Sequence, residues 1–198
     1  TAVLTSEPER CPALPSSARL VEVPASLMQS VSSMRTPQGV LFSLRLPQEG
    51  ALRVQPGMLL LDRIQDPGNL GTILRTADAF DLPVLLTNGC ADPFSEKTVR
   101  ASMGAVFRRP PQSAPMEDVR VCHAAGIPIA ATALSDTACD LREVDLMRHL
   151  VVIGSEGQGI CPELLAASDR QIIIPMQPRC ESLNAAVAAA IVLWQMRP

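Results

Sequence analysis

Short apolar runs alternate with amphipathic segments through most of the chain. Buried strands are predicted at residues 58–61, 84–86, 127–133, 149–153 and 172–174. Helices are predicted between and after these runs, at residues 71–80, 96–103, 118–125, 163–167 and 183–196. Because strands that alternate with helices form parallel sheets, the pattern predicts an α/β domain with helices on both faces of its sheet.

The first 50 residues follow a different and shorter pattern. Strands are predicted at 2–5, 20–23 and 40–46, and a helix is predicted from Ala25 to Ser33. The segment 47–56 contains prolines and a glycine and has little apolar content, so it is the predicted linker. We therefore expect a partial α/β module at 1–50 and a second domain at 51–198.

Composition narrows the classes of function. The chain has 198 residues, 47% of them hydrophobic, which is enough to bury a core. Its formal net charge of −3 argues against wrapping a long nucleic acid through bulk electrostatics, although a local basic patch remains compatible. Lys97 is the only lysine, so arginines supply nearly all cationic groups and can hold phosphates with forked donors.

Several further patterns are missing from the sequence. No apolar run has the length of a membrane span, and the first residues do not resemble a signal peptide. The six cysteines form no C-x-x-C pair, and His123 and His149 lack metal-type spacing. We therefore expect free thiols, no metal and a cytoplasmic protein that does not associate with membranes.

The first polar block that suggests a site is Asp66-Pro67-Gly68-Asn69-Leu70-Gly71, followed by Arg75. It reads as a turn in which Asn69 caps a helix. Because helical side chains lean toward the helix N-terminus, Arg75 is expected to lie over Gly71. The absence of a side chain at Gly71 leaves an open floor for a ligand, and the N–H groups at the start of the helix favour an anion there. The alternative is a plain turn and cap, with Arg75 paired to Asp78 on the surface.

Two later blocks also follow apolar runs. Gly154-Ser155-Glu156-Gly157-Gln158-Gly159 has glycines that let a ligand approach the backbone, but it lacks the G-x-G-x-x-G spacing of dinucleotide sites. The alternative is a simple strand-to-helix loop, in which Glu156 has no evident structural role. Ser182-Leu183-Asn184 precedes the last helix, and Ser182 could simply cap it. That helix is apolar on nearly every face, which suggests a partner subunit.

Together, the three blocks predict one site at the carboxyl ends of parallel strands. In this order they resemble the signatures of the SpoU (TrmH-type) branch of the SPOUT methyltransferases, here Asn69-x-Gly71-x-x-x-Arg75, Gly154-x-Glu156-x-x-Gly159 and Ser182-Leu183-Asn184. The resemblance covers about residues 58–198 and is closest to the rRNA-directed members. Residues 19–46 resemble, more weakly, the tail of an L30-like substrate-binding domain.

The resemblance implies a parallel sheet tied in a trefoil knot, an exception among folds. It implies methyl transfer from S-adenosylmethionine to a ribose 2′-oxygen of RNA, with rRNA favoured over tRNA, and a homodimer formed through helix 183–196. Two alternatives share the fold that the resemblance implies. One is a tRNA-directed enzyme, and the other is a non-catalytic RNA-binding or assembly protein. An unrelated α/β enzyme, such as a nucleotide-dependent oxidoreductase, is a further alternative.

The resemblance also assigns residues to roles. The catalytic positions are Asn69, Arg75, Glu156, Ser182 and Asn184. The cofactor-binding positions are Gly154, Ile174, Leu183, Ala133 and Gly159. Separately from the resemblance, the candidates for RNA contact are Arg100, Arg108 and Arg109, with a solvated arginine-rich edge as the alternative. Since a guanidinium hardly deprotonates, we expect Arg75 to stabilise a developing alkoxide or grip a phosphate rather than act as a base.

Overall fold

The computed structural model describes residues 1–46, 50–124, 126–177, 179–180 and 182–197. The chain forms two compact units, Thr1–Gln48 and Glu49–Pro198. The boundary between them falls inside the segment 47–56 that the sequence predicts as a linker.

The N-terminal unit is a small three-stranded sheet with one α-helix. Its elements are β1 (Ala2–Thr5), a 3-10 turn (Pro8–Arg10), β2 (Arg19–Glu22), α1 (Ala25–Val31) and β3 (Val40–Ser43). The strand order is β2-β1-β3, with β1 parallel to β2 and antiparallel to β3. Val3 and Met28 are its most buried apolar side chains. The identity of this unit as part of an L30-like domain stays a prediction.

The larger unit contains a seven-stranded sheet and six α-helices within the described residues. Its strands are β4 (Leu59–Asp62), β5 (Val84–Leu86), β6 (Gln112–Ser113), β7 (Ile129–Thr132), β8 (Cys139–Asp140), β9 (Leu150–Gly154) and β10 (Arg170–Ile173). Its helices are α2 (Pro67–Ala79), α3 (Glu96–Ala101), α4 (Ala105–Arg108), α5 (Met116–Ala124), α6 (Pro162–Ala167) and α7 (Ala185–Met196). Two 3-10 turns, Leu141–Glu143 and Leu146–Arg148, precede β9.

The sheet is parallel throughout, in the order β6-β5-β4-β9-β7-β10-β8. This confirms the predicted α/β class. The predicted strands and helices are all present. β1 and β5 have the predicted bounds and the other predicted elements have shifted ends, whereas α4, β6, β8 and the 3-10 turns were not predicted. No helix in the described ranges is long and apolar enough to cross a membrane.

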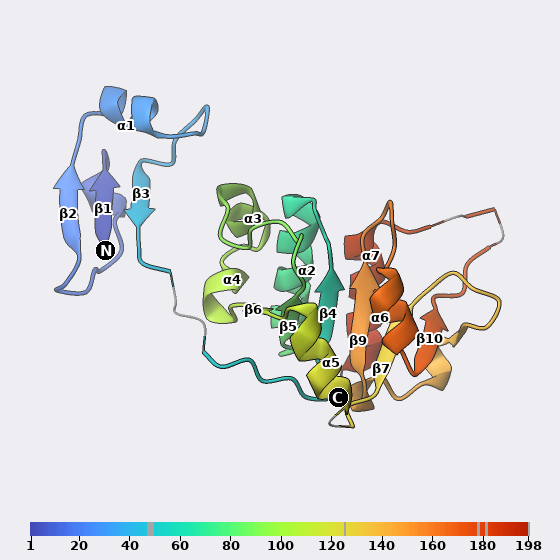
Figure 1. Cartoon of the computed structure of the whole chain (residues 1–198). Helices are drawn as coiled ribbons and strands as arrows, with labels where there is room; N and C mark the ends of the chain where they lie inside the picture. The colour runs from blue at the N-terminus through green and yellow to red at the C-terminus, as the bar shows by residue number, and fades with distance from the viewer. Residues whose placement is uncertain (47–49, 125, 178, 181, 198) are drawn as a thin grey trace. The chain divides into compact units, whose positions relative to one another are not determined.

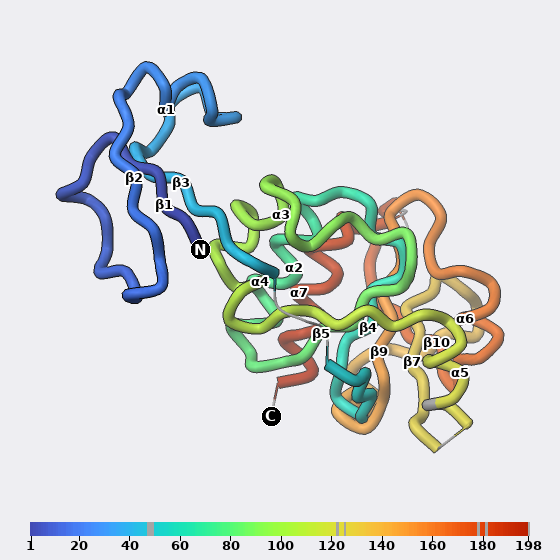
Figure 2. Tube along the Cα trace, turned by 60° about the vertical axis from the view of Figure 1, so that its left-hand side comes forward, coloured from blue at the N-terminus to red at the C-terminus, as the bar shows by residue number. Residues whose placement is uncertain are grey.

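The core lies on both faces of this sheet, as the apolar strands predict. In β4, Leu59 and Leu61 pack into the cluster that contains α2 and α7, whereas Leu60 packs into the cluster that contains α5 and α6. Figures 1 and 2 show α2 and α7 together on one face and α5 and α6 on the other. Alternate residues of one strand thus bury opposite faces, which explains the continuous apolar run.

Candidate functional site

A cavity of about 630 Å³ lies where β7, β9 and β10 end. Its lining comes from residues within four segments, 132–135, 153–160, 171–176 and 182–188, and from Leu165 of α6. Ligands of open parallel sheets bind at this edge, beyond the carboxyl ends of the strands. Small residues supply much of the lining, so peptide groups are accessible to a ligand.

All five residues predicted to bind the cofactor line this cavity: Ala133, Gly154, Gly159, Ile174 and Leu183. Two of the predicted catalytic residues, Glu156 and Ser182, line it as well. Among the described residues of the lining, Glu156 is the only one with an ionisable side chain. The cavity therefore combines an apolar, backbone-rich wall with one carboxylate.

Gly154 is required by the fold of the loop that follows it. A Cβ at this position would lie 2.2 Å from the carbonyl carbon of Gly159, so no other residue fits without moving the backbone. The Gly159 N–H donates to the Ser155 carbonyl at 2.9 Å, which closes the loop 154–160 on itself. From the sequence, this glycine was predicted to let a ligand approach the backbone. In the structure, its nearest neighbour is the main chain of the same loop.

The three blocks meet through a chain of side-chain hydrogen bonds. Asn69 Nδ2 donates to Glu156 Oε1, and Asn184 Nδ2 donates to Asn69 Oδ1 at 3.1 Å. Asn184 Oδ1 also accepts from the N–H groups of Ala186 and Val187, so Asn184 rather than Ser182 caps α7. Glu156 thus has a structural partner that sequence analysis did not identify. The predicted site residues Asn69, Glu156 and Asn184 form one connected group.

The start of α2 differs from the prediction. The helix begins at Pro67, and its N-cap is Asp66, whose side chain accepts from the Asn69 N–H at 2.7 Å. Asn69 is therefore inside the first turn and does not cap the helix. This leaves its side-chain amide available for Glu156 and Asn184.

Gly71 does not form an open floor. A Cβ there would lie 2.6 Å from the Thr98 carbonyl oxygen and 2.9 Å from the Ser102 nitrogen, because α3 packs directly against this point of α2. The physical reason for the glycine is close helix–helix contact. The prediction of a ligand floor beside Arg75 was therefore wrong.

Arg75 is exposed on α2 and does not line the cavity. Within the described ranges it forms no hydrogen bond or ion pair. The alternative pairing with Asp78 is also wrong, because Asp78 accepts from Arg108 at 2.6 Å. The site brings together four of its predicted catalytic residues and leaves this guanidinium outside.

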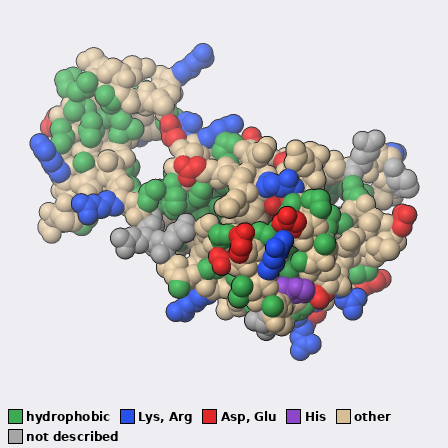
Figure 3. All heavy atoms as spheres, in the orientation of Figure 1, with side chains coloured by type: hydrophobic (Ala, Val, Ile, Leu, Met, Phe, Trp, Pro, Cys, Tyr) green, Lys and Arg blue, Asp and Glu red, His purple; other side chains and the backbone are tan. Residues whose placement is uncertain are grey.

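The three arginines predicted to contact RNA each have an acidic partner. Arg100 lies 3.7 Å from Glu96, Arg108 lies 2.6 Å from Asp78, and Arg109 pairs with Asp81. On the larger unit, the face shown in Figure 3 carries basic and acidic side chains interspersed rather than a single basic stripe. These pairs reduce the net charge that the α3–α4 edge offers to a phosphate.

The two histidines have ordinary structural contacts. His123 Nε2 lies 3.2 Å from Asp169 Oδ2, and His149 Nδ1 lies 2.8 Å from the Asp145 carbonyl oxygen. Burial raises the pKa of Asp169, but hydrogen bonds from the Ile129 N–H and from His123 outweigh that effect, so its pKa is lowered. No cluster of three or more potential metal ligands occurs in the part of the chain that the structure describes.

A buried polar group that was not predicted from the sequence lies at the end of β4. Asp62, at the end of β4, is 2% exposed, and its carboxylate accepts from the Thr87 hydroxyl at 2.9 Å and the Cys161 N–H at 2.7 Å. The available signal was the charged pair Asp62–Arg63 directly after an apolar strand. A buried carboxylate with these bonds fixes the strand end relative to the start of α6.

The fold and the cavity define a parallel α/β protein whose ligand site is built from loops at the carboxyl edge of the sheet. Residues 56–194 match the sequence model of the SpoU rRNA Methylase family. The chain belongs to this family, as its three sequence blocks indicated.

Individual relatives support the same assignment. The chain is 36% identical over 170 residues to the 23S rRNA (guanosine(2553)-2′-O)-methyltransferase RlmP of Bacillus subtilis, a match that covers 85% of this chain and 68% of that protein. A putative RNA methyltransferase of the TrmH family from Porphyromonas gingivalis has a TM-score of 0.84 and 37% identity, covering 99% of this chain and 81% of that one. An AdoMet-bound rRNA methyltransferase from Sinorhizobium meliloti has a TM-score of 0.83 and 34% identity, covering 98% and 78%.

Proposed function

We propose that this protein transfers a methyl group from S-adenosylmethionine to a ribose 2′-oxygen of RNA, with ribosomal RNA as the substrate. The observation that carries the proposal is that the second and third sequence blocks line one backbone-rich cavity, while Asn69 of the first block is hydrogen-bonded to both of them. The family match and the names of the relatives add support, since they include an rRNA 2′-O-methyltransferase and an rRNA methyltransferase bound to AdoMet.

The cavity fits this cofactor in size and chemistry. Its volume of about 630 Å³ lies in the range typical of sites for small cofactors. S-adenosylmethionine supplies a methyl carbon activated by a positively charged sulfur. The Glu156 carboxylate gives the cavity a negative charge that complements such a cation. We assign Gly154, Gly159, Ala133, Ile174 and Leu183 to holding it, largely through main-chain groups.

The connected side chains orient the reacting groups. Asn69, Glu156 and Asn184 fix one another through hydrogen bonds, so the Glu156 side chain in the cavity wall has a defined orientation. Much of the rate enhancement of a displacement reaction comes from such alignment. Ser182 adds a hydroxyl from the cavity wall.

Arg75 has a different role in this proposal. Because its guanidinium is exposed and unpaired among the described residues, it is available to bind a phosphate of the RNA or the alkoxide that forms when the ribose hydroxyl loses its proton. When RNA binds across α2, the reacting ribose and Arg75 come together next to the hydrogen-bonded side chains of Asn69, Glu156 and Asn184.

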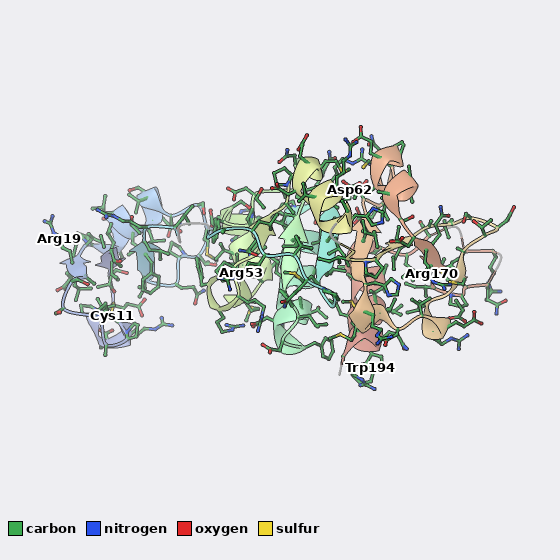
Figure 4. All side chains as sticks on the ribbon, turned by 60° about the horizontal axis from the view of Figure 1, so that its bottom comes forward. Cys11, Arg19, Arg53, Asp62, Arg170 and Trp194 are labelled. Atoms are coloured by element: carbon green, nitrogen blue, oxygen red, sulfur yellow. The ribbon has the colours of Figure 1, made fainter. Side chains whose placement is uncertain are left out.

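We further propose that a second copy of the chain covers α7. A groove of about 550 Å³ between α2 and α7 is lined by Asn69, Thr72, Asn184 and apolar residues of α7. Val187, Ile191 and Trp194 are 49%, 37% and 53% exposed there, an apolar surface that is costly to leave in water. Figure 4 labels Trp194 on α7 at the surface of the unit. A second copy bound in this groove would cover the hydrogen-bonded side chains of Asn69 and Asn184.

The trefoil knot implied by the family resemblance is part of the same proposal. The parallel order β4-β9-β7-β10 and the shared cavity of residues 153–160 and 182–188 support it, because these segments are distant in sequence and adjacent in space.

The test uses total RNA from cells with and without the protein, and the purified protein with radiolabelled methyl donor. A 2′-O-methyl group blocks alkaline cleavage at its phosphodiester, so alkali-resistant label in rRNA is the expected result. Label in tRNA would favour the tRNA-directed alternative. Binding of the donor without transfer to any RNA would contradict the proposal and favour a non-catalytic RNA-binding protein.

A further inference from the structure

Arg63 reaches from the end of β4 to the outer side of the loop 154–160. Its Nη1 donates to the Gln158 side-chain oxygen at 3.0 Å, and its Nη2 donates to the Gly159 carbonyl oxygen at 3.4 Å. Its Nε lies 3.3 Å from Asp62 Oδ2, so the carboxylate that holds Cys161 also orients this guanidinium. Figure 4 labels Asp62 near the start of α6.

The backbone at Arg63 is in an unusual conformation. Its φ is +54°, in the left-handed region that residues with a β-carbon rarely adopt. The Arg63 N–H donates to the Thr87 hydroxyl at 3.2 Å, which holds this conformation. At Gly89, a Cβ would lie 3.3 Å from Arg63 Cγ, so the glycine leaves room for the arginine stem. The surroundings therefore fix a strained turn that aims the side chain at the loop.

The loop held by Arg63 forms one wall of the cavity. Gln158 and Gly159 line the cavity, whereas Arg63 does not. Within the loop, a bridge joins Ser155 to Gly159. From the rest of the fold, Asn69 holds the loop at Glu156, and the Arg63 guanidinium and Asp62 hold it at residues 158–161.

We propose that Arg63 is a positioning residue for cofactor binding: it holds the loop 154–160 in the shape that accepts S-adenosylmethionine, without touching the cofactor. This inference rests on the proposed function for the identity of the ligand. The part of the inference that concerns restraint of the loop 154–160 does not depend on which ligand binds.

The first experiment compares Arg63→Asn with the unsubstituted protein. Asparagine tolerates a positive φ but is too short to reach Gln158. In the cofactor-free protein we expect the amides of residues 155–160 to exchange with solvent about tenfold faster, because charged hydrogen bonds are lost. We expect the Kd for S-adenosylmethionine, measured by calorimetry, to rise about tenfold.

The matched control is Arg120→Asn. Arg120 is an exposed arginine whose Nη2 lies 3.4 Å from Glu163, and it does not line the cavity. Its removal is expected to change neither exchange in the loop nor affinity for the cofactor. An equal effect in both variants would overturn the proposal, since it would show a general loss of arginine charge or stability.

A double-mutant cycle tests the specific contact. Gln158→Ala should weaken cofactor binding when Arg63 is present and have less effect in the Arg63→Asn background. Arg63→Lys, which keeps a cation but not the forked geometry, should give an intermediate affinity. Additive effects at positions 63 and 158 would overturn the proposal. If Arg63→Asn proves too unstable to study, the same cycle can be run with Arg63→Lys.

Failure of this inference and failure of the proposed function give different results. If the unsubstituted protein does not bind S-adenosylmethionine, the proposed cofactor is wrong, and the role of Arg63 falls with it. If it binds the cofactor, but Arg63→Asn leaves loop exchange and affinity unchanged, only the role of Arg63 is wrong.

Discussion

The surface of α2 around Arg75 and the edge formed by α3 and α4 both carry arginines, but in different electrostatic settings. Arg75 has no partner among the described residues, whereas Arg108 and Arg109 are paired with Asp78 and Asp81. An arginine without a partner can bind a phosphate without first breaking an ion pair. The position of acidic partners, and not the number of arginines, therefore decides which surface is available to RNA.

Among these variants, removal of Arg75 should change activity most. Arg75→Ala should lower the single-turnover rate of methyl transfer by about 10²-fold or more, since a donor to the developing alkoxide is lost. The Kd for S-adenosylmethionine should stay within about twofold, because Arg75 does not line the cavity. Arg75→Lys, which keeps the charge alone, should recover part of the rate. A near-normal rate for Arg75→Ala with saturating RNA would remove this residue from the mechanism.

The contact between the two regions is tested at Gly71. Gly71→Ala places a methyl group against the backbone of α3 and should lower the free energy of unfolding by about 1–3 kcal/mol in denaturant titrations. Gly157→Ala is the matched control, because a Cβ at Gly157 meets no atom within 4 Å. If both variants are equally stable, α3 does not pack as closely on α2 as described.

The salt dependence of RNA binding shows which of the two surfaces, that of α2 around Arg75 or the α3–α4 edge, makes more phosphate contacts with RNA. Arg75→Ala should reduce the slope of log K against log salt concentration by about 1, as expected for the loss of one phosphate contact. The double variant Arg108→Ala, Arg109→Ala should reduce it less, because both charges are already paired. A larger reduction in the double variant would make the α3–α4 edge the main RNA surface and reverse the comparison.

The smallest expected effect concerns the ion pair between Arg108 and Asp78. Both partners are at the surface, with 59% and 19% of their side chains exposed. A double-mutant cycle with Arg108→Ala and Asp78→Ala should therefore give a coupling free energy of only about 0.5 kcal/mol. The value should fall at high salt. No coupling at low salt would mean that Arg108 is as available as Arg75.

The sequence predicted most of the fold because its signals were local. The apolar run in β4 predicted a strand buried on both faces, and Leu59 and Leu60 do point to opposite cores. In contrast, β6 and β8 have only two residues each. Such short strands exist because a neighbouring strand pairs with them, and no periodicity can indicate that.

The candidate site could be predicted in position but not in its contacts. Spacing placed Asn69, Glu156 and Asn184 at strand and helix ends, and the topology then brought them together. The roles of Gly71 and Gly154 could not be read from the sequence, because each depends on a backbone segment that approaches from elsewhere. The same applies to Asp62 and Arg63, whose partners lie far along the chain.

The tight packing of Gly154 on Gly159 has a consequence for redesign of the proposed activity. A wall made of peptide groups stays the same whatever side chains are exchanged, so it cannot be trimmed to admit a bulkier alkyl donor. Enlarged donors would need space made at Leu183 or Ile174, whose side chains can be shortened. Libraries that seek transfer of groups larger than methyl should therefore begin with these two residues and leave the glycine loop unchanged.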